Sequence, residues 1–240
     1  MLLTVFAILS FAAENNTAPI AVHPSADEVI AQMVKRDSER RSALDGYISV
    51  RHYVLDNSRH QKHAQMVVKA ICRKDGSKQF EVVSSTGWGG ARKYVFPRLL
   101  EAETDASRPG DSADSRFLPE NYSFRMLGTE QFGGRSAYVI SVAPKTRSKY
   151  LIRGTIWVDA EDLAIVRIQG EPARNPSFWI RSVQIAHVYE KHGMFWLPVS
   201  NISVSDARIF GTTELRIDYL DYVINESPAA VRTTAQARLP

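Results

Sequence analysis

The 240-residue chain contains a single cysteine, Cys72, so it cannot form an internal disulfide and is not a small disulfide-stabilised domain. Its 30 Lys and Arg residues are scattered among 26 Asp and Glu residues, without the basic block that is typical of nucleic-acid-binding segments. Beyond residue 12, no apolar run approaches the length needed to span a bilayer. These absences predict a protein that does not bind nucleic acid and is not an integral membrane protein.

The sequence motifs of common catalytic and metal sites are also missing. The chain has no GxSxG segment to present a nucleophilic serine, and the glycine-rich segment 85–92 (STGWGGAR) lacks the Lys-Ser/Thr pair of a phosphate-binding loop. His60 and His63 have no neighbouring cysteine or pair of carboxylates to complete a zinc site. Cys72 falls on an apolar strand face, which is typical of a buried, unreactive thiol. We therefore expect no enzymatic activity, no cofactor and no bound metal.

Residues 2–12 (LLTVFAILSFA) form a short apolar run that ends in small residues. Ser10 and Ala12 fit the −3 and −1 positions of a signal-peptidase site, which predicts cleavage after Ala12 or Ala13. The run is too short to cross a membrane, and no cysteine follows it that could be acylated. We therefore expect a periplasmic protein that is not itself lipidated. The predicted organisation is a signal peptide at 1–13, a linker at 14–24, one domain at 25–226 and a flexible tail at 227–240.

The segment after the linker, HPSADEVIAQMVKRDSERRSALDGY, has the pattern of one helix. Ser25 and Glu28 have the spacing of a capping box, which predicts that the helix starts there. An apolar stripe recurs at helical spacing through Val29, Ile30, Met33 and Val34. The Asp45-Gly46 pair predicts the end of the helix.

After Gly46 the apolar residues recur at every second position, as they do in β-strands. One strand face is formed by Ala64, Met66, Val68, Ala70 and Cys72. Short turns separate the strands, and their signals are Asp75-Gly76, Gly133-Gly134 and Gly193. This order predicts a mainly β fold of the α+β class, with a large, curved antiparallel sheet rather than alternating β and α units.

Residues 94–122 interrupt the strand pattern. The segment begins as a short helix with Pro97 in its first turn and with Leu99 and Leu100 as its apolar residues. It continues as a run rich in Ser, Asp, Gly and Pro. Irregular insertions of this length are usually functional lids or disordered segments. We interpret the segment as a helical flap over one face of the sheet, with disorder alone as the alternative.

The second half of the chain carries segments that are typical of a known family. They are NYSFRMLGTEQFGGRSAYVISVAPK (121–145), GTIWVDAEDLAIVRIQGEP (154–172), PSFWIRSVQIAHVYEKHGMFWLP (176–198) and FGTTELRIDYLDY (210–222). Together with the opening helix and the flap, they make residues 25–224 resemble the periplasmic lipoprotein-carrier superfamily. That superfamily comprises the LolA/LolB-like outer-membrane lipoprotein-sorting proteins and their relatives, including the RseB/MucB-type regulators of the envelope stress response.

The resemblance implies an incomplete β-barrel whose open side is covered by helices and whose cavity takes acyl chains. An acyl chain offers only apolar surface, so its site needs a wide apolar lining. The residues that we expect to line the cavity or its lid are Trp88, Phe96, Leu99, Leu100, Phe124, Trp157, Phe178, Trp179 and Trp196. For each aromatic residue, ordinary core packing is the alternative. In the best-known carrier a strand arginine helps to hold the lid shut, and Arg51 is the nearest candidate for that role here.

Asp159, Glu161 and Asp162 lie close together between two β-rich runs, TIWV and LAIVRI. Clustered carboxylates can serve acid–base catalysis or bind a metal. Asp is also common in turns, because its side chain accepts hydrogen bonds from nearby backbone amides. We interpret the three as the water-exposed tip of a hairpin, with pKa values near the ordinary ones.

The hairpin interpretation also predicts a register. We expect Val158 to pair with Leu163. Ile156 then lies beside Ile165 on one face of the sheet, and Trp157 lies beside Ala164 on the other. Trp157 would thereby be a cavity-lining residue.

Two functions from different classes fit the fold that the sequence predicts. The first is a periplasmic carrier that binds the acyl chains of lipoproteins or other lipids and takes them to the outer membrane. For such a carrier the resemblance implies an inner-membrane release complex and an outer-membrane acceptor as partners. The alternative is an envelope-stress signalling module of the same fold that binds a membrane-anchored protein partner. We expect the chain to be a monomer.

Overall fold

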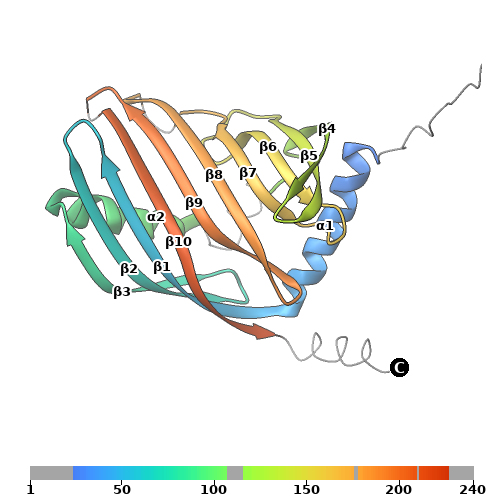
Figure 1. Ribbon diagram of the computed structural model, residues 1–240, viewed down its shortest axis with the longest axis horizontal. Helices are drawn as coiled ribbons and strands as arrows, with labels where there is room; N and C mark the ends of the chain where they lie inside the picture. The colour runs from blue at the N-terminus through green and yellow to red at the C-terminus, as the bar shows by residue number, and fades with distance from the viewer. Residues whose placement is uncertain (1–23, 107–115, 176–177, 210, 227–240) are drawn as a thin grey trace, which may run out of the picture.

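The computed structural model describes residues 24–106, 116–175, 178–209 and 211–226 (Figure 1). The predicted signal peptide, the linker up to residue 23 and the tail lie outside the described residues, as do residues 107–115 of the predicted flap. The helices are α1 (Ala26–Ala43) and α2 (Phe96–Ala106), and a short π-helix, η1 (Ala91–Val95), leads into α2. The strands are β1 (Leu44–Asn57), β2 (Lys62–Arg73), β3 (Lys78–Gly87), β4 (Tyr122–Phe132), β5 (Arg135–Pro144), β6 (Ile152–Asp159), β7 (Ile165–Pro172), β8 (Ile180–His192), β9 (Phe195–Ala207) and β10 (Gly211–Glu226).

The ten strands form one antiparallel sheet in the order β3-β2-β1-β10-β9-β8-β7-β6-β5-β4. Its first and last strands in the chain are neighbours, third and fourth from the β3 end, and Tyr53 of β1 lies opposite Ile217 of β10. Within the described residues β3 and β4 are the two ends of the sheet and do not pair with each other, so the curved sheet is an incomplete β-barrel (Figure 1). This confirms the predicted fold class.

Helix α1 starts as the capping box predicts. The Ser25 hydroxyl accepts a hydrogen bond from the Glu28 amide at 3.2 Å, and the Glu28 carboxylate accepts one from the Ser25 amide at 2.8 Å. Val29 and Ile30 are buried against the half of the sheet that contains β4 to β7, beside Ile140 and Ile156. The apolar stripe of the sequence is therefore the packing face of α1.

The end of α1 differs from the expectation. The helix stops at Ala43, and β1 begins at Leu44 without an intervening turn, so Asp45-Gly46 is part of the strand. Gly46 lies at an irregularity of the β1–β10 pairing with a φ of 139°, and a Cβ atom there would come within 2.5 Å of the Cys72 carbonyl oxygen. The glycine is thus required by a close approach of two strands and does not end the helix.

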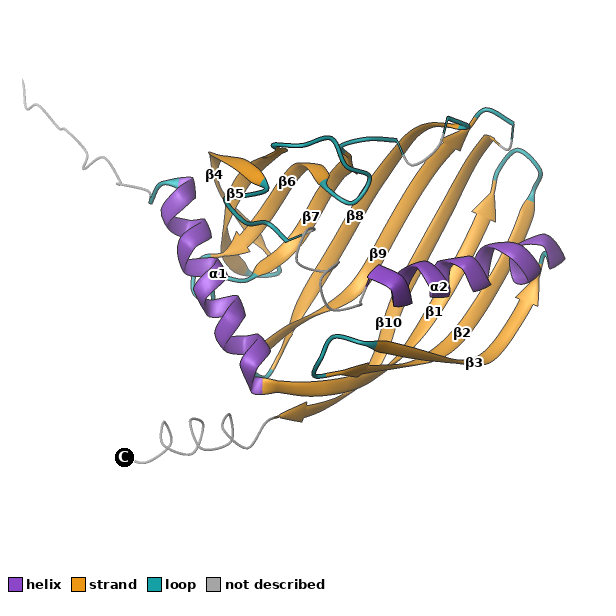
Figure 2. Cartoon of the chain, turned by 180° about the vertical axis from the view of Figure 1, so that it is seen from behind, coloured by secondary structure: helices purple, strands orange, loops and turns teal. Residues whose placement is uncertain are grey.

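Helix α2 covers the other half of the sheet. Phe96 is fully buried, and Leu99 and Leu100 pack with it against a cluster that includes Met66 and Ile217. The helix predicted around Pro97 is therefore present, and η1 extends it toward the N-terminus. Figure 2 shows α1 and α2 on the same side of the sheet and at opposite ends of it, with β8 to β10 between them. In the described part of the chain, no helix is long and apolar enough to cross a membrane.

Candidate functional site

A cavity of about 430 Å³ lies between α1 and the sheet. We call it the α1 cavity. Its wall is largely apolar and includes Met33, Val34, Ile165, Ile168, Phe195 and Leu197, while Asp37, Arg40 and Arg41 of α1 contribute charged groups. The predicted lining residue Trp196 also lies on this wall.

A second cavity of about 420 Å³, the α2 cavity, lies between α2 and the middle of the sheet. Leu99 and Glu103 of α2 form one wall, and the floor includes Tyr53, His187, Ser203, Leu215, Ile217 and Tyr219. Tyr189 of β8 lines both cavities, so they adjoin across its side chain. We refer to the two adjoining cavities as the trough.

The titratable floor residues of the trough are held in their neutral forms. Burial lowers the pKa of His187 to about 4, so the imidazole is uncharged at neutral pH. Burial likewise raises the pKa of Tyr219 to about 12 and that of Tyr189 further above its ordinary value. The middle of the trough therefore presents ring surfaces and uncharged hydrogen-bonding groups.

In the α2 cavity, charge is concentrated where α2 meets the sheet. The Glu103 carboxylate accepts hydrogen bonds from Arg51 Nη1 at 2.5 Å, from Lys78 Nζ at 2.9 Å and from the Tyr53 hydroxyl at 3.2 Å. We call these four residues the α2 latch. The latch joins α2 to two strands, because Arg51 and Tyr53 lie on β1 and Lys78 lies on β3.

Arg51, the strand arginine named from the sequence, lies beneath α2 with only 1% of its side chain exposed. Its guanidinium stacks over the Tyr219 and Phe80 rings, with Cζ 4.9 Å and 5.4 Å from their centroids, and its Nε donates to the Ser49 hydroxyl at 3.3 Å. These contacts hold the guanidinium in place from the sheet side, with Nη1 directed at Glu103.

The charges of the latch stabilise one another. Burial alone would lower the pKa of Arg51, but Glu103 and the nearby tyrosines raise it above its ordinary value. Burial alone would raise the pKa of Glu103, but the positive charges of Lys78 and Arg51 lower it. Both groups are therefore ionised at neutral pH.

The predicted lining residues do not all lie together. Leu99 lines the α2 cavity, and Trp88, Phe96 and Leu100 pack in the same apolar cluster beneath η1 and α2. Phe124 packs against the α1-side cluster beside Tyr122. These residues belong to the trough or to the packing that supports its two helices.

Trp157, Phe178 and Trp179 lie elsewhere, which differs from the expectation. Trp157 packs with Val139 and Val166 in a separate cluster, since it points to the sheet face opposite Ile156, and Arg167 stacks on its ring with Cζ 4.7 Å from the centroid. Phe178 and Trp179 precede β8 and are exposed. None of the three lines the cavities found in the described residues.

The register predicted for β6 and β7 is wrong. Val158 pairs with Ile165, Ile156 pairs with Ile168, and an irregularity follows Trp157. Leu163, the expected partner of Val158, has a positive φ of 50° and is buried in the cluster beneath α1. Burial of this side chain against α1 favours a longer turn than the simple hairpin.

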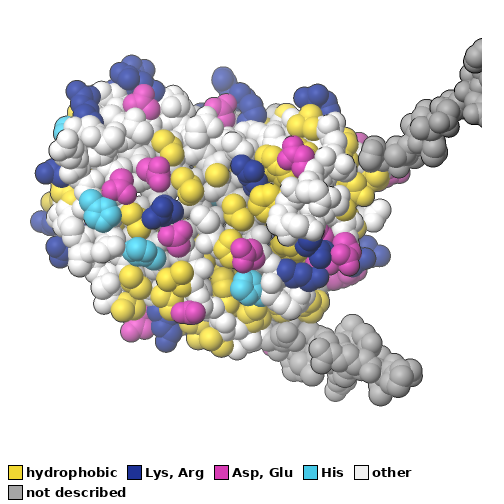
Figure 3. All heavy atoms as spheres, viewed as in Figure 1, with side chains coloured by type: hydrophobic (Ala, Val, Ile, Leu, Met, Phe, Trp, Pro, Cys, Tyr) yellow, Lys and Arg dark blue, Asp and Glu magenta, His cyan; other side chains and the backbone are white. Residues whose placement is uncertain are grey.

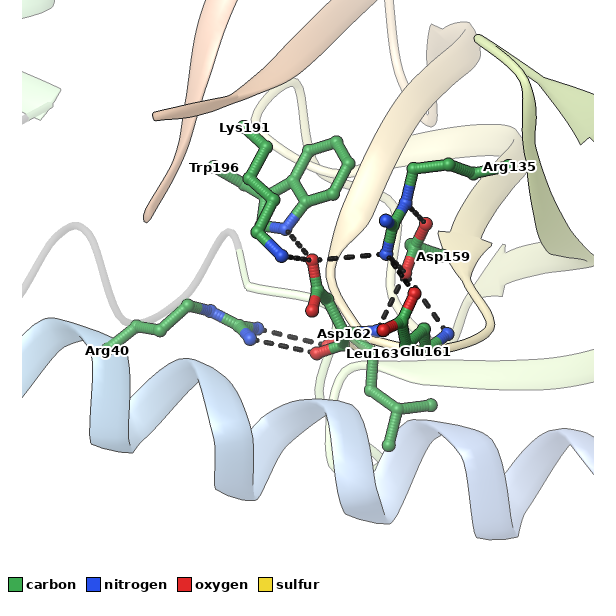
Figure 4. A network of polar contacts seen from close by, with 8 residues as sticks. All are labelled: Arg40, Arg135, Asp159, Glu161, Asp162, Leu163, Lys191 and Trp196. Atoms are coloured by element: carbon green, nitrogen blue, oxygen red, sulfur yellow. Dashed lines mark hydrogen bonds and ion pairs between the residues drawn. The ribbon is translucent and has the colours of Figure 1, made fainter. Parts of the chain in front are cut away.

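The interpretation of the carboxylates as a water-exposed tip is also wrong for Asp159, whose exposed fraction is 1% (Figure 4). Arg135 donates to both of its oxygens, at 2.5 and 2.8 Å, and the amides of Glu161 and Asp162 donate to Oδ1. Burial alone would raise the pKa of Asp159, but these hydrogen bonds lower it. Asp159 is therefore a buried acceptor that fixes the turn, and the turn itself was predicted correctly.

Asp162 extends this network to other strands and to α1. Its carboxylate contacts Lys191 Nζ at 2.6 Å and accepts a hydrogen bond from the Trp196 indole at 3.1 Å. Arg40 of α1 donates to the carbonyl oxygens of Asp162 and Leu163 at 2.9 and 3.0 Å (Figure 4). The network anchors α1 to the β6–β7 turn, and each of its carboxylates is paired with a cation.

His60 and His63 do not take part in a metal site among the described residues. His63 Nδ1 lies 2.8 Å from Asp56, and His60 lies in the turn between β1 and β2. The part of the chain that the structure describes has no group of three or more His, Cys, Asp or Glu side chains that could hold a metal ion. Cys72 is buried on the face where the sequence placed it, and its Sγ lies 3.6 Å from Arg51 Nη2.

Several residues of the site were not found from the sequence. Glu103 lies four residues after Leu99 and seven after Phe96, which places it on the apolar face of α2, and a carboxylate on such a face is a signal that could have identified it. Lys78 lies on β3 and His187 and Tyr189 lie on β8, far from it in the chain, and no local pattern marks them.

Residues 119–225 match the model of a family of unknown function, DUF5686. A comparison with curated protein sequences finds no match. Similar solved structures include a domain from Vibrio parahaemolyticus with the provisional name of outer membrane lipoprotein-sorting protein, at 13% identity over 88% of this chain and 99% of that one, with a TM-score of 0.46.

Two further similar structures are a DUF1329 family protein from Desulfovibrio piger and a LolA superfamily protein from Nitrosomonas europaea. The first is 13% identical over 83% of this chain and 93% of that one, with a TM-score of 0.43. The second is 11% identical over 87% of this chain and 97% of that one, with a TM-score of 0.39. Two of these three names, a lipoprotein-sorting protein domain and a LolA superfamily protein, are names of the superfamily that the sequence motifs resemble.

Proposed function

We propose that this protein is a carrier that holds the acyl chains of lipoproteins or other lipids in the trough beneath α1 and α2. The observation that carries the proposal is the pair of adjoining cavities, of about 430 and 420 Å³, that share Tyr189. Each has a volume in the range of known small-molecule sites, which is roughly 300–1,000 Å³. Together they follow the concave side of the open sheet and offer an elongated space.

The chemistry of the trough suits an apolar chain that has one polar end. Burial of each methylene group stabilises the complex by about 0.8 kcal/mol, so a largely apolar wall such as that of the α1 cavity supports tight binding. The neutral His187, Tyr189 and Tyr219 avoid the desolvation penalty that charged floor residues would impose. Lys78 and Arg51 are available for an anionic or ester group beside α2 once the latch opens.

A carrier must also release its cargo, and α2 is suited to act as its lid. It is held by Phe96, Leu99 and Leu100 and by one carboxylate, Glu103, which contacts Arg51, Lys78 and Tyr53. A short helix with so few contacts can open locally at a smaller free-energy cost than the whole domain. We propose the lid-holding role of Arg51 on this ground.

The remaining parts of the proposal concern the setting in which the carrier works. We propose an exported, periplasmic protein in which residues 25–226 form a single lipid-binding domain that functions as a monomer. It would take cargo from a donor at one membrane and pass it to an acceptor at another, without catalysing a reaction. The described helices, none of which could cross a membrane, fit a carrier that moves between the two.

The proposal is tested by displacement of a fluorescent acyl probe from the purified protein. We expect the probe to bind with a blue-shifted emission and to be displaced by phospholipid and by a lipoprotein acyl anchor. Ser203, whose side chain lines the α2 cavity, should give weaker binding when it is replaced by Phe, whereas replacement of the exposed Glu101 by Gln should not affect it. Absence of probe binding by the folded wild-type protein would contradict the proposal and favour the regulator alternative.

A further inference from the structure

Three segments that lie far apart in the chain meet at one rim of the sheet. They are 145–153, which connect β5 to β6 and include the start of β6; the described residues 171–175 and 178–181, from the end of β7 to the start of β8; and 206–209, from the end of β9 toward β10. The Arg208 amide donates to the Trp179 carbonyl at 2.9 Å, and Arg208 Nε donates to the Phe178 carbonyl at 3.2 Å. This rim contains the β9–β10 turn at the upper left of Figure 1, and the two cavities of the trough include none of its residues.

The rim is strongly basic. A hollow of about 380 Å³ between the first two segments is lined by Arg147, Arg153, Arg174 and Arg181, and Arg208 lies in the third segment. Only two carboxylates, Glu171 and Asp206, lie within the described residues of these segments, beside Arg153 at 3.8 Å and Arg181 at 3.4 Å. Figure 3 shows Lys and Arg side chains along this upper edge of the molecule. The rim therefore has an excess of positive charge on a chain whose net charge is only +4.

Large apolar side chains project from the same segments. Tyr150, Phe178, Trp179 and Ile209 are 63, 76, 57 and 55% exposed. The Phe178 and Trp179 rings meet edge-on at 5.7 Å between centroids, and Arg208 Cζ lies 5.0 Å from the Phe178 centroid. The two rings are thus fixed at the rim by contacts with each other and with Arg208 while most of their surface faces outward.

This combination fits a lipid surface better than a protein surface. Arginine and aromatic residues are also enriched at protein interfaces, so the preference for lipid depends on the excess of positive charge over the two carboxylates of the rim and on the arginine-lined hollow. At a bilayer, Trp and Tyr side chains favour the headgroup level, and Arg and Lys side chains are attracted to anionic lipids. Arginine also binds phosphate oxygens in a bidentate geometry, and the arginine-lined hollow offers several such groups together.

We propose that this arginine–aromatic rim docks the protein on a bilayer that contains anionic phospholipid. Phe178, Trp179 and Ile209 insert below the headgroups, and the arginines around the hollow contact the headgroup phosphates. Docking does not depend on the contents of the trough, so it is a second property of the protein beside the proposed carrier function. It would place the chain at a membrane while leaving α2 free to open.

The test is flotation of the purified protein with two kinds of vesicle, of phosphatidylcholine alone and of phosphatidylcholine mixed with phosphatidylglycerol. We expect binding to the mixed vesicles only, weakening as salt rises. The double variant Arg147→Gln/Arg174→Gln should lower the partition coefficient by about five-fold per charge removed. The double variant Phe178→Ser/Trp179→Ser should lower it by at least about ten-fold.

Matched control variants separate rim effects from general ones. Lys35→Gln/Arg36→Gln removes two exposed charges from α1, and Val83→Ser/Leu127→Ser removes two exposed apolar side chains from the strands at the ends of the sheet. Both controls should bind the mixed vesicles like the wild type. Brominated phosphatidylglycerol should quench tryptophan fluorescence in the wild type and much less in Trp179→Phe, because the other tryptophans lie outside the rim.

The proposal is overturned if the wild type binds both kinds of vesicle equally, binds neither, or binds a protein partner through this rim with no lipid requirement. It is also overturned if the control variants lose as much binding as the rim variants. All variants are checked for the wild-type thermal midpoint and for binding of the acyl probe. Retained probe binding in a protein that fails to float shows that only the rim proposal is wrong, whereas flotation without probe binding contradicts only the carrier proposal.

Discussion

Arg51 on β1 and Glu103 on α2 lie 2.5 Å apart, measured from Nη1 to Oε1, and this ion pair joins the floor of the trough to the helix above it. The guanidinium is buried and is positioned by Tyr219, Phe80 and Ser49, so the sheet side of the contact is fixed before α2 closes. Opening of α2 must therefore separate a preformed cation from its carboxylate. That separation is the main polar barrier to release of α2.

Replacement of Glu103 by Gln should loosen α2 without unfolding the sheet. The amide has a similar size but no charge, so Arg51 and Lys78 lose their counter-ion, and we expect a destabilisation of about 2–3 kcal/mol. Hydrogen exchange should show faster exchange in α2 and unchanged exchange in α1. The control is Glu101→Gln on the exposed face of α2. Equal protection of α2 in both variants would show that the latch does not hold the lid.

The latch should also open in acid. The pKa of Glu103 is lowered in the folded protein, so its contribution to stability is present above the ordinary pKa of about 4.5 and is lost as pH falls through the lower folded value. Exchange in α2 should therefore rise in the wild type as pH falls below that ordinary value. The Glu103→Gln variant should show high exchange throughout, and a wild-type profile that is flat down to acid unfolding would argue against the latch.

His187 predicts a separate pH dependence of stability. Its pKa falls from 6.5 to about 4 on folding, so the unfolded chain binds a proton that the folded chain excludes between these values. Stability should decrease as pH falls from about 6.5 to 4, by up to about 3 kcal/mol. His187→Gln should remove this dependence of the free energy of unfolding on pH, as measured by urea unfolding at several pH values. His60→Gln, in the exposed β1–β2 turn, should keep it. Identical slopes in the two variants would contradict the assignment.

Asp159 should contribute to the stability of the fold and should not affect cargo binding. In the Asp159→Asn variant, the amide oxygen can still accept hydrogen bonds from the backbone amides of the turn, but the side chain cannot neutralise Arg135. We therefore expect the free energy of unfolding to fall by about 2 kcal/mol. Glu161→Gln, at a mostly exposed side chain, should change it by less than about 0.5 kcal/mol. Both variants should retain the acyl probe, and loss of the probe from either would indicate a direct role of the turn in binding.

Filling the α2 cavity should weaken binding, whereas shrinking Trp157 should not. Ser203→Phe adds a ring within the cavity, and we expect at least about a ten-fold loss of affinity for the acyl probe. Trp157→Phe alters a side chain on the opposite sheet face and should leave affinity unchanged. The reverse order of effects would show that the cargo binds the outer face of the sheet.

Features fixed by neighbouring residues could be predicted from the sequence. The Ser25–Glu28 capping box, the Asp75-Gly76 turn and the alternating face from Ala64 to Cys72 each depend on residues a few positions apart, and the structure has them as expected. The strands and turns predicted a large, curved antiparallel sheet, and the resemblance to a known family implied that it forms an incomplete barrel. Arg51 could be named only through the resemblance to a carrier family in which a strand arginine helps to hold the lid.

Features fixed by distant residues could not be predicted in the same way. Arg51 and Glu103 are 52 positions apart, and only the curvature of the sheet brings α2 onto β1. The irregularity after Trp157 and the burial of Leu163 beneath α1 change the register of β7. Trp157 lies on the face opposite Ile156 as expected, but the helices cover the face of Ile156, and no local pattern shows which face they cover. The burial of Asp159 could not be predicted, because its partner Arg135 lies at the start of β5 and no local pattern links the two residues.

The central claim, that the trough holds acyl chains, is tested most directly by native mass spectrometry of the protein purified from the cell envelope without added lipid. We predict a monomer that carries a mass of one lipid or lipoprotein acyl anchor and that loses it in the Ser203→Phe variant. A wild-type protein that is folded and empty under the same conditions, or whose bound lipid persists in Ser203→Phe, would contradict the claim.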